Sequence, residues 1–275
     1  MNGGIIEAMT KRYNPTQPII VGLCGQAGTG KTSVAKGFVP LASATEIMFD
    51  DELDDEQQIR IVLDHLFFAM PLYELASIRT KTEGSKSKER MKYAIHDVLA
   101  DLYGRSPLYG APRYKDLVEL VKWTVKTPID PDDYKPRSFL QTVGMRCREL
   151  NEDCFVQWVD RKIKAASAPF INDGVAHLTF LSDLRMENEA EWVAAQPNGV
   201  LVQYTCDDEV RFDRIERRDG EPMTEDQKNH ISENEHTKFR KGIFDVVIDS
   251  TDLKIKEQAV ATTTAINATF GIELF

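Results

Sequence analysis

The sequence has no hydrophobic run long enough to cross a bilayer, because 18 apolar residues never follow one another. It also lacks the N-terminal pattern of a basic stretch, an apolar stretch and small residues that is typical of a secretory signal. No internal repeat and no low-complexity tract is present. These absences predict a soluble, cytoplasmic protein with no membrane partner.

Cysteine and histidine are scarce. The four cysteines are scattered, and no two of them have the C-x-x-C spacing of a zinc site. We therefore expect reduced, mostly buried thiols. The five histidines form no metal-ligand pattern, so the sequence predicts no zinc centre. The cysteines are Cys24, Cys147, Cys154 and Cys206.

Positive charge is in deficit. The net charge is -10 and the sequence pI is near 5.1, which argues against a large general nucleic-acid surface but leaves room for a local basic groove. The length of 275 residues, of which 42% are hydrophobic, suits one α/β domain with insertions or one domain with a small lid.

The most informative stretch is residues 19–38. The apolar run 19–23 predicts a buried parallel strand, and residues 33–38 begin a helix. Between them, Gly25 to Thr32 satisfy the phosphate-binding pattern G-x-x-x-x-G-K-[ST]. The pattern in this strand–helix context is specific, whereas a glycine-rich loop alone marks any tight turn.

The residue types of this loop fit the chemistry of a phosphate chain. Glycines keep side chains away from the backbone N–H groups that bind phosphate, and the next helix points its positive end at the same place. Lys31 supplies a mobile charge for the β- and γ-phosphates, and Thr32 offers a hydroxyl to Mg²⁺. The residues expected to bind ATP are Gly25, Gly28, Thr29, Gly30, Lys31, Thr32 and Ser33.

Later segments complete an α/β pattern. Strands are expected over 177–185, 200–206 and 244–249, with helices between them and a closing helix over 253–268. The strand over 177–185 ends near Asp183, which with Thr32 is a candidate Mg²⁺ ligand. The sequence thus predicts a three-layer P-loop kinase fold with a parallel central sheet.

We expect a tail over 1–18 and a single kinase domain over 19–275. Residues 59–78 have helical apolar spacing broken at Pro71, and residues 80–90 resemble a loop. A helical lobe is inserted over about 80–136. The acidic run over 50–58 is interpreted as a solvated helix start in preference to a metal site.

Two arginine-rich windows have two interpretations each. In the window that begins at Arg137, residues 137, 141, 144 and 148 share a helical face, which would hold an anion or simply lie on the surface. Around 210–220, Arg211, Arg214 and Arg218 align at spacings of three and four. They would form the cationic ridge of a lid over about 207–240 or a solvated charged helix.

Several blocks resemble bacteriophage deoxynucleoside monophosphate kinases. Phe68-Ala-Met-Pro-Leu72 is similar to their F-A-D-P-L segment, with Met70 in place of the acid. Leu140-Gln-Thr-Val-Gly144, the arginines at 146 and 148, and Trp158 resemble their L-Q-x-x-G…R…W block. Ser182-Asp-Leu-Arg-Met-Glu-Asn-Glu-Ala190 resembles S-D-x-R-x-x-N-E-A, the most specific block after the loop.

The resemblance implies transfer of the γ-phosphoryl group of ATP to a deoxynucleoside 5′-monophosphate, with Mg²⁺ as cofactor. Lys31, Asp183, Arg214 and Arg218 would be catalytic. The acceptor would be bound by Phe68, Arg137, Gln141, Arg148, Trp158, Arg185 and Glu189. The compartment would be the host-cell cytoplasm if the chain is phage-encoded, and a homodimer is compatible with the sequence.

Two alternatives stay open. The same fold could phosphorylate 5-hydroxymethyluracil within DNA, with the long insertion holding a strand; only this alternative makes DNA a partner. The basic segments over 81–92 and 137–148 favour it, and the net charge of -10 opposes it. An ATP-binding switch without an acceptor is the second alternative, although the Ser-Asp-Leu-Arg sequence after the strand fits an acceptor site better.

Overall fold

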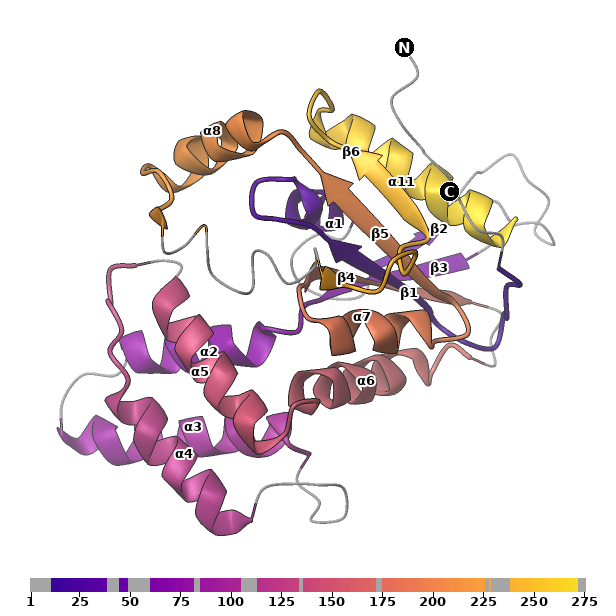
Figure 1. Cartoon of the computed structure of the whole chain (residues 1–275). Helices are drawn as coiled ribbons and strands as arrows, with labels where there is room; N and C mark the ends of the chain where they lie inside the picture. The colour runs from indigo at the N-terminus through magenta and orange to yellow at the C-terminus, as the bar shows by residue number, and fades with distance from the viewer. Residues whose placement is uncertain are drawn as a thin grey trace. The chain divides into compact units, whose positions relative to one another are not determined.

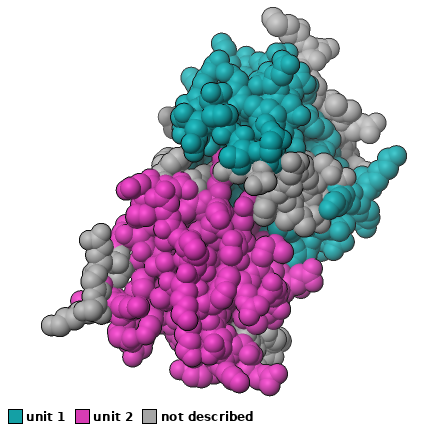
Figure 2. Space-filling model, turned by 60° about the vertical axis from the view of Figure 1, so that its left-hand side comes forward, with its two compact units in different colours: residues 1–67, 163–275 teal, residues 68–162 magenta. Residues whose placement is uncertain are grey.

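The computed structural model describes residues 11–38, 45–48, 60–81, 85–104, 113–133, 136–171, 175–225, 228 and 238–271. The acidic run over 50–58 and most of the expected lid beyond residue 225 lie outside these residues. The chain divides into two compact units, Met1–Phe67 with Ile163–Phe275 and Phe68–Lys162, which Figure 2 colours separately. The expected insertion of about 80–136 falls inside the second unit.

Unit 1 is built on a sheet. Among the described residues, six strands pair in the order β2-β3-β4-β1-β5-β6 (Figure 1). The strands are β1 (Ile19–Cys24), β2 (Thr45–Met48), β3 (Arg60–Leu66), β4 (Ala176–Leu184), β5 (Gly199–Thr205) and β6 (Val246–Asp249). β3, β4, β1, β5 and β6 run parallel, and only β2 pairs in the antiparallel direction. The predicted α/β class with a parallel central sheet is confirmed.

Helices cover both faces of this sheet. α1 (Lys31–Phe38) and α11 (Ile255–Phe270) pack on one face, where Ile19, Val21 and Leu23 join Ala35 and Ile266 in one hydrophobic core. On the other face lies α7 (Glu187–Ala194): a Cβ built at Gly22 would lie 3.4 Å from Val193. Alternate residues of β1 thus face opposite helix layers, which explains why the strand is apolar throughout.

Unit 2 is helical. It contains α2 (Met70–Lys81), α3 (Ser85–Leu102), α4 (Tyr114–Lys126), α5 (Arg137–Leu150) and most of α6 (Cys154–Ser167). α3 packs against α2 and α4, and α5 packs against the same two helices. The core is aliphatic and aromatic, with Leu75, Ile95, Leu99, Phe139 and Val143 almost completely buried.

Two local predictions were wrong. Residues 60–66 form β3, not the start of a helix: Ile61, Val62 and Leu63 are buried in the sheet between β2 and β4. A short apolar run does not distinguish a buried strand from a buried helix by its periodicity. Residues 80–90 are also not one loop, because α2 continues to Lys81 and α3 begins at Ser85. Lys, Glu and Arg are good helix formers even where they stay exposed.

No helix in the described part of the chain is long and apolar enough to cross a membrane.

Candidate functional site

The chain order of the strands singles out the carboxyl ends of β1 and β4. β1 lies between β4 and β5, and the chain leaves β1 through α1 on one face but leaves β4 through α7 on the other. The order of connection therefore reverses between β1 and β4. Open parallel sheets bind ligands outside the carboxyl ends of the strands at such a switch point. Here that edge carries the glycine-rich loop after Cys24 and the Asp183–Arg185 segment.

The glycine-rich loop needs its three glycines for steric reasons. Gly25, Gly28 and Gly30 have φ angles of 144°, 87° and 97°, a region that L-residues with side chains rarely adopt. A Cβ would lie 2.5 Å from the Tyr204 carbonyl oxygen at Gly25 and 2.5 Å from the Arg211 carbonyl oxygen at Gly28. The loop is thus packed tightly against neighbouring segments, and this packing explains the glycines at these positions.

The side chains of the loop divide into buried and exposed groups. Lys31 is only 5% exposed and its Nζ donates to the Gln26 carbonyl oxygen at 3.1 Å. Thr29 Oγ1 donates to the same carbonyl at 2.9 Å. Thr32 and Ser33 are exposed at the start of α1. The ammonium group is therefore held inside the loop, and two hydroxyl groups remain at the amino end of the helix.

The thiol of Cys24 shows which charges gather at the end of β1. Burial raises the pKa of Cys24 to about 12, while the positive charges of Lys31 and Arg185 lower it and the negative charge of Glu189 raises it. Groups from the glycine-rich loop and from the segment after β4 thus act on one thiol. The structure brings together these two sequence blocks, which are separated by about 150 residues in the chain.

Asp183 lies one residue before Leu184, which pairs with Cys24 across the β1–β4 register. Asp183 is half-buried at the end of β4. In the described part of the chain no three His, Cys, Asp or Glu residues gather as a metal cage. A Mg²⁺ bound by one hydroxyl, one carboxylate and substrate phosphates needs no such cage. Thr32 and Asp183, a hard-oxygen donor set, fit this kind of site.

Glu189 has a defined structural partner. It is almost fully buried, and Oε2 accepts the backbone N–H groups of Arg185 at 2.9 Å and Met186 at 3.1 Å. The carboxylate therefore caps the first turn of α7 and holds the backbone of Arg185. This cap by itself gives a structural reason for a glutamate at position 189 in the N-E-A block.

The arginines of α8 (Asp208–Asp219) are engaged within unit 1. Arg211 is buried, pairs with Asp208 at 2.6 Å and lies over the Phe212 ring. Arg214 donates to the carbonyl oxygens of Ser250 at 2.9 Å and Thr251 at 3.0 Å. Arg218 forms two hydrogen bonds with Asp219, at 2.6 and 2.7 Å. A role in phosphate neutralisation would require Arg214 and Arg218 to exchange these partners.

No protein-family model matches the chain, and no curated protein is similar to it in sequence. The resemblance to bacteriophage deoxynucleoside monophosphate kinases therefore stays a prediction from motifs.

The remaining predicted acceptor residues lie in unit 2. Arg137, Gln141, Gly144 and Arg148 do share one face of α5, as their spacing predicts for a helix. At Gly144 a Cβ would come within 3.0 Å of Leu72, so the small residue lets α5 approach α2 closely. Arg148 also lies over the Phe155 ring, 4.5 Å from its centroid.

Trp158 and Phe68 are structural members of unit 2 in this state. Phe68 is completely buried, and Trp158 is buried with its Nε1 donating to Asp101 at 2.8 Å. Lys162 pairs with the same carboxylate at 3.0 Å and lies over the indole ring. The motif that contains Trp158 thus secures α6 to α3, and this contact explains the residue without a substrate.

Sequence reasoning missed two groups near the sheet edge. Gln258 on α11 is 1% exposed, and its Oε1 would lie 2.3 Å from a Cβ at Gly30. His65, at the end of β3, has its Nε2 2.7 Å from Ser182 Oγ. Burial and the charge of Lys36 lower the pKa of His65, although Asp64 raises it. Neither group belongs to a recognisable local pattern, because both reach the edge only through folding.

Proposed function

We propose that this chain is an ATP-dependent kinase that transfers the γ-phosphoryl group of ATP to a deoxynucleoside 5′-monophosphate. The observation that carries the proposal is the bare, positive-φ glycine loop at the β1–β4 switch point, with buried Lys31 inside it. Asp183 at the end of the adjacent strand supplies the second half of the constellation. Backbone N–H groups, a lysine and a carboxylate in this arrangement suit a phosphate chain with its metal ion.

Each residue of unit 1 then has a role that its contacts support. The loop N–H groups bind the phosphate oxygens, and Lys31 exchanges the neutral Gln26 carbonyl for a charged oxygen, which is the stronger hydrogen bond. Thr32 and Asp183 would hold Mg²⁺, which neutralises phosphate charge when it is bound. Glu189 acts as a positioning residue because it fixes the backbone of Arg185.

The acceptor is oriented by cationic and amide side chains. Arg185, whose backbone is held by Glu189 in unit 1, is suited to a phosphate. Within unit 2, the Arg137–Gln141 face of α5 offers a guanidinium and an amide, which the motif resemblance assigns to the acceptor. No dedicated general base is required, since positioning and charge neutralisation dominate phosphoryl transfer. Arg214 and Arg218 would join the transferring phosphate only after they leave Ser250, Thr251 and Asp219.

The test is ADP release from ATP and Mg²⁺ in the presence of dTMP, dGMP, dAMP, dCMP or dUMP. We expect turnover with at least one of them and a loss of about 100-fold or more in Lys31→Ala, the scale of a removed electrostatic contact in a transition state. Lys256→Ala is the matched control, because Lys256 is an exposed lysine of α11. Unchanged turnover in Lys31→Ala would contradict the assignment.

One observation favours the DNA-acceptor alternative. Unit 2 carries 17 Lys and Arg against 14 Asp and Glu, a net charge of +3, although the whole chain has -10. A duplex that contains 5-hydroxymethyluracil therefore belongs in the same assay. Phosphate transfer to this duplex, together with silence on all five free monophosphates, would replace the mononucleotide acceptor. ATP hydrolysis that needs no acceptor would instead indicate the nucleotide-binding switch.

A further inference from the structure

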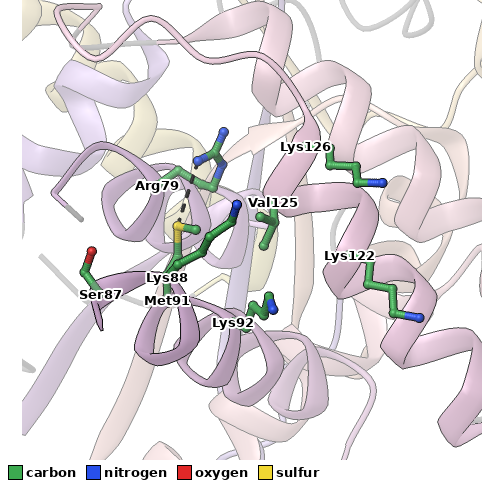
Figure 3. Close-up of a pocket in the computed structure, with 8 residues that line it drawn as sticks. All are labelled: Arg79, Ser87, Lys88, Met91, Lys92, Lys122, Val125 and Lys126. Atoms are coloured by element: carbon green, nitrogen blue, oxygen red, sulfur yellow. Dashed lines mark hydrogen bonds between the residues drawn. The ribbon is translucent and has the colours of Figure 1, made fainter. Parts of the chain in front are cut away.

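Unit 2 contains a basic hollow that the proposed kinase chemistry does not use. The hollow has a volume of about 530 Å³ and lies among α2, α3 and α4 (Figure 3). Five of its eight lining residues are cationic and none is acidic. The lining residues are Arg79, Ser87, Lys88, Met91, Lys92, Lys122, Val125 and Lys126. None of them is among the residues expected to bind ATP or the acceptor.

The positive charge of this hollow is only partly compensated. Lys92 pairs with Glu89 at 2.5 Å and Lys122 pairs with Glu119 at 2.8 Å. All four side chains of these i,i+3 pairs are substantially exposed, so each pair contributes little. Lys88 and Lys126 form no ion pair with any residue that the structure describes.

Arg79 adds a donor that lacks an acceptor. Its guanidinium group donates to the Thr127 carbonyl oxygen at 3.0 Å and approaches Met91 Sδ at 3.8 Å. Its Nε is buried and has no hydrogen-bond partner among the described residues. Burial lowers the pKa of Arg79, but a guanidinium remains charged at any physiological pH. Figure 3 shows Arg79 and Lys88 projecting into the same space from α2 and α3.

We call the cationic lining of this hollow the basic track; it consists of Arg79, Lys88, Lys92, Lys122 and Lys126. On α3 and on α4, two lysines four residues apart stand about 6 Å apart along the helix axis.

The extent of the track fits a linear polyanion better than a small one. A hollow of this volume would accommodate a mononucleotide, but its five cations exceed the charge of a single phosphate group, which is at most about -2. Single strands are bound by positively charged grooves that follow the sugar–phosphate backbone.

We propose that the basic track binds the sugar–phosphate backbone of a single nucleic-acid strand. The local charge of unit 2 permits this although the chain as a whole is acidic. Binding needs neither ATP nor Mg²⁺, so it stands or falls independently of the proposed kinase activity.

The experiment is fluorescence anisotropy with a labelled oligothymidylate of about 12 nucleotides, without ATP or Mg²⁺, across salt concentrations. Each phosphate contact on a single strand contributes about 0.7 to the slope of log K against log salt. The double variant Lys88→Ala/Lys126→Ala should therefore have a slope shallower by about 1.4. Between about 50 and 200 mM salt, the wild-type protein should lose about sevenfold more affinity than this variant.

Two controls make the result specific. Lys241→Ala/Lys256→Ala removes the same charge from exposed positions of unit 1 and should keep the wild-type slope. Lys88→Arg/Lys126→Arg keeps the charge and should keep the slope. Lys88→Gln/Lys126→Gln, which removes the charge but leaves a polar side chain, should show the shallower slope and serves as the test if the alanine variant unfolds. Lys31→Ala should bind the oligonucleotide normally, which separates this site from the kinase site.

Three outcomes would overturn the proposal. The first is absence of oligonucleotide binding at about 50 mM salt. The second is an equal change of slope in the Lys88/Lys126 and Lys241/Lys256 alanine variants, which would show only a net-charge effect. The third uses inorganic tripolyphosphate with protein that already carries Lys31→Ala. Binding of tripolyphosphate that depends on Lys88 and Lys126, without oligonucleotide binding, would make the hollow a site for a free polyphosphate.

Discussion

Replacing Gly28 by alanine tests the packing of the glycine-rich loop directly. Gly28 has a φ of 87°, and an added Cβ would lie 2.5 Å from the Arg211 carbonyl oxygen and 3.0 Å from the Arg211 Cβ. The clashing atom belongs to the backbone of α8, so rotation of a side chain cannot relieve the contact. The loop or the helix has to move.

The expected loss of stability has two contributions. A non-glycine residue in this backbone region costs about 1–3 kcal/mol. Displacement of well-packed neighbours costs about 1–3 kcal/mol more. The free energy of unfolding should therefore fall by about 2–6 kcal/mol, a large share of the 5–15 kcal/mol typical of folded proteins. The proposed ATP binding should fall with it, because the loop N–H groups shift as the loop moves away from Arg211.

Urea unfolding followed by circular dichroism measures the first effect, and ATP titration at low urea measures the second. Gly37→Ala is the matched control: Gly37 lies in α1, its φ is not positive, and a Cβ there would meet no atom within 4 Å. That variant should be neutral or more stable by up to about 1 kcal/mol. Wild-type stability in Gly28→Ala, or an equal loss in Gly37→Ala, would refute the reasoning.

Three further predictions concern buried polar groups. His177 is 4% exposed with both ring nitrogens unpartnered among the described residues, so His177→Leu should raise the free energy of unfolding by about 1–3 kcal/mol. Burial lowers the pKa of His177, although the negative charge of Asp64 raises it. Below pH 6.5 the unfolded protein therefore binds more protons than the folded protein, which destabilises the wild type. The stability that His177→Leu gains in urea should grow as pH falls below that value. Trp158→Phe removes the hydrogen bond from the indole N–H to Asp101. Burial raises the pKa of Asp101, but this hydrogen bond and Lys162 outweigh burial, so the pKa lies below its usual value. Trp158→Phe should therefore lower the free energy of unfolding by about 1 kcal/mol at pH 7, and this loss should shrink as pH falls below 3.8. A difference in melting temperature between variant and wild type that does not change with pH would contradict this prediction. Asp245 accepts from Lys11 at 2.8 Å and from the Leu201 backbone at 2.9 Å, so Asp245→Ala should cost about 1–3 kcal/mol in urea unfolding, and an unchanged midpoint would exclude that role.

The local sequence determined the elements with strong patterns. β1 is a continuous apolar run and its glycine loop is punctuated at fixed spacings, so both were predictable from neighbouring residues alone. The helical face shared by Arg137, Gln141 and Arg148 was also predictable, because helical period is a local property. β3 was missed because the apolar run Ile61 to Leu63 suits a buried strand and a buried helix equally well. Only pairing with β4, which lies far along the chain, makes this run a strand.

Tertiary structure decided what surrounds each motif. Three examples depend on contacts between distant segments. Arg211 and Gln258 pack close to glycines of the glycine-rich loop, Arg214 donates to a carbonyl oxygen after β6, and Trp158 donates to Asp101. The basic track likewise exists only because α2, α3 and α4 pack side by side. Sequence periodicity specifies which face of a helix is polar, but the partner of that face is chosen by long-range packing, which no local pattern encodes.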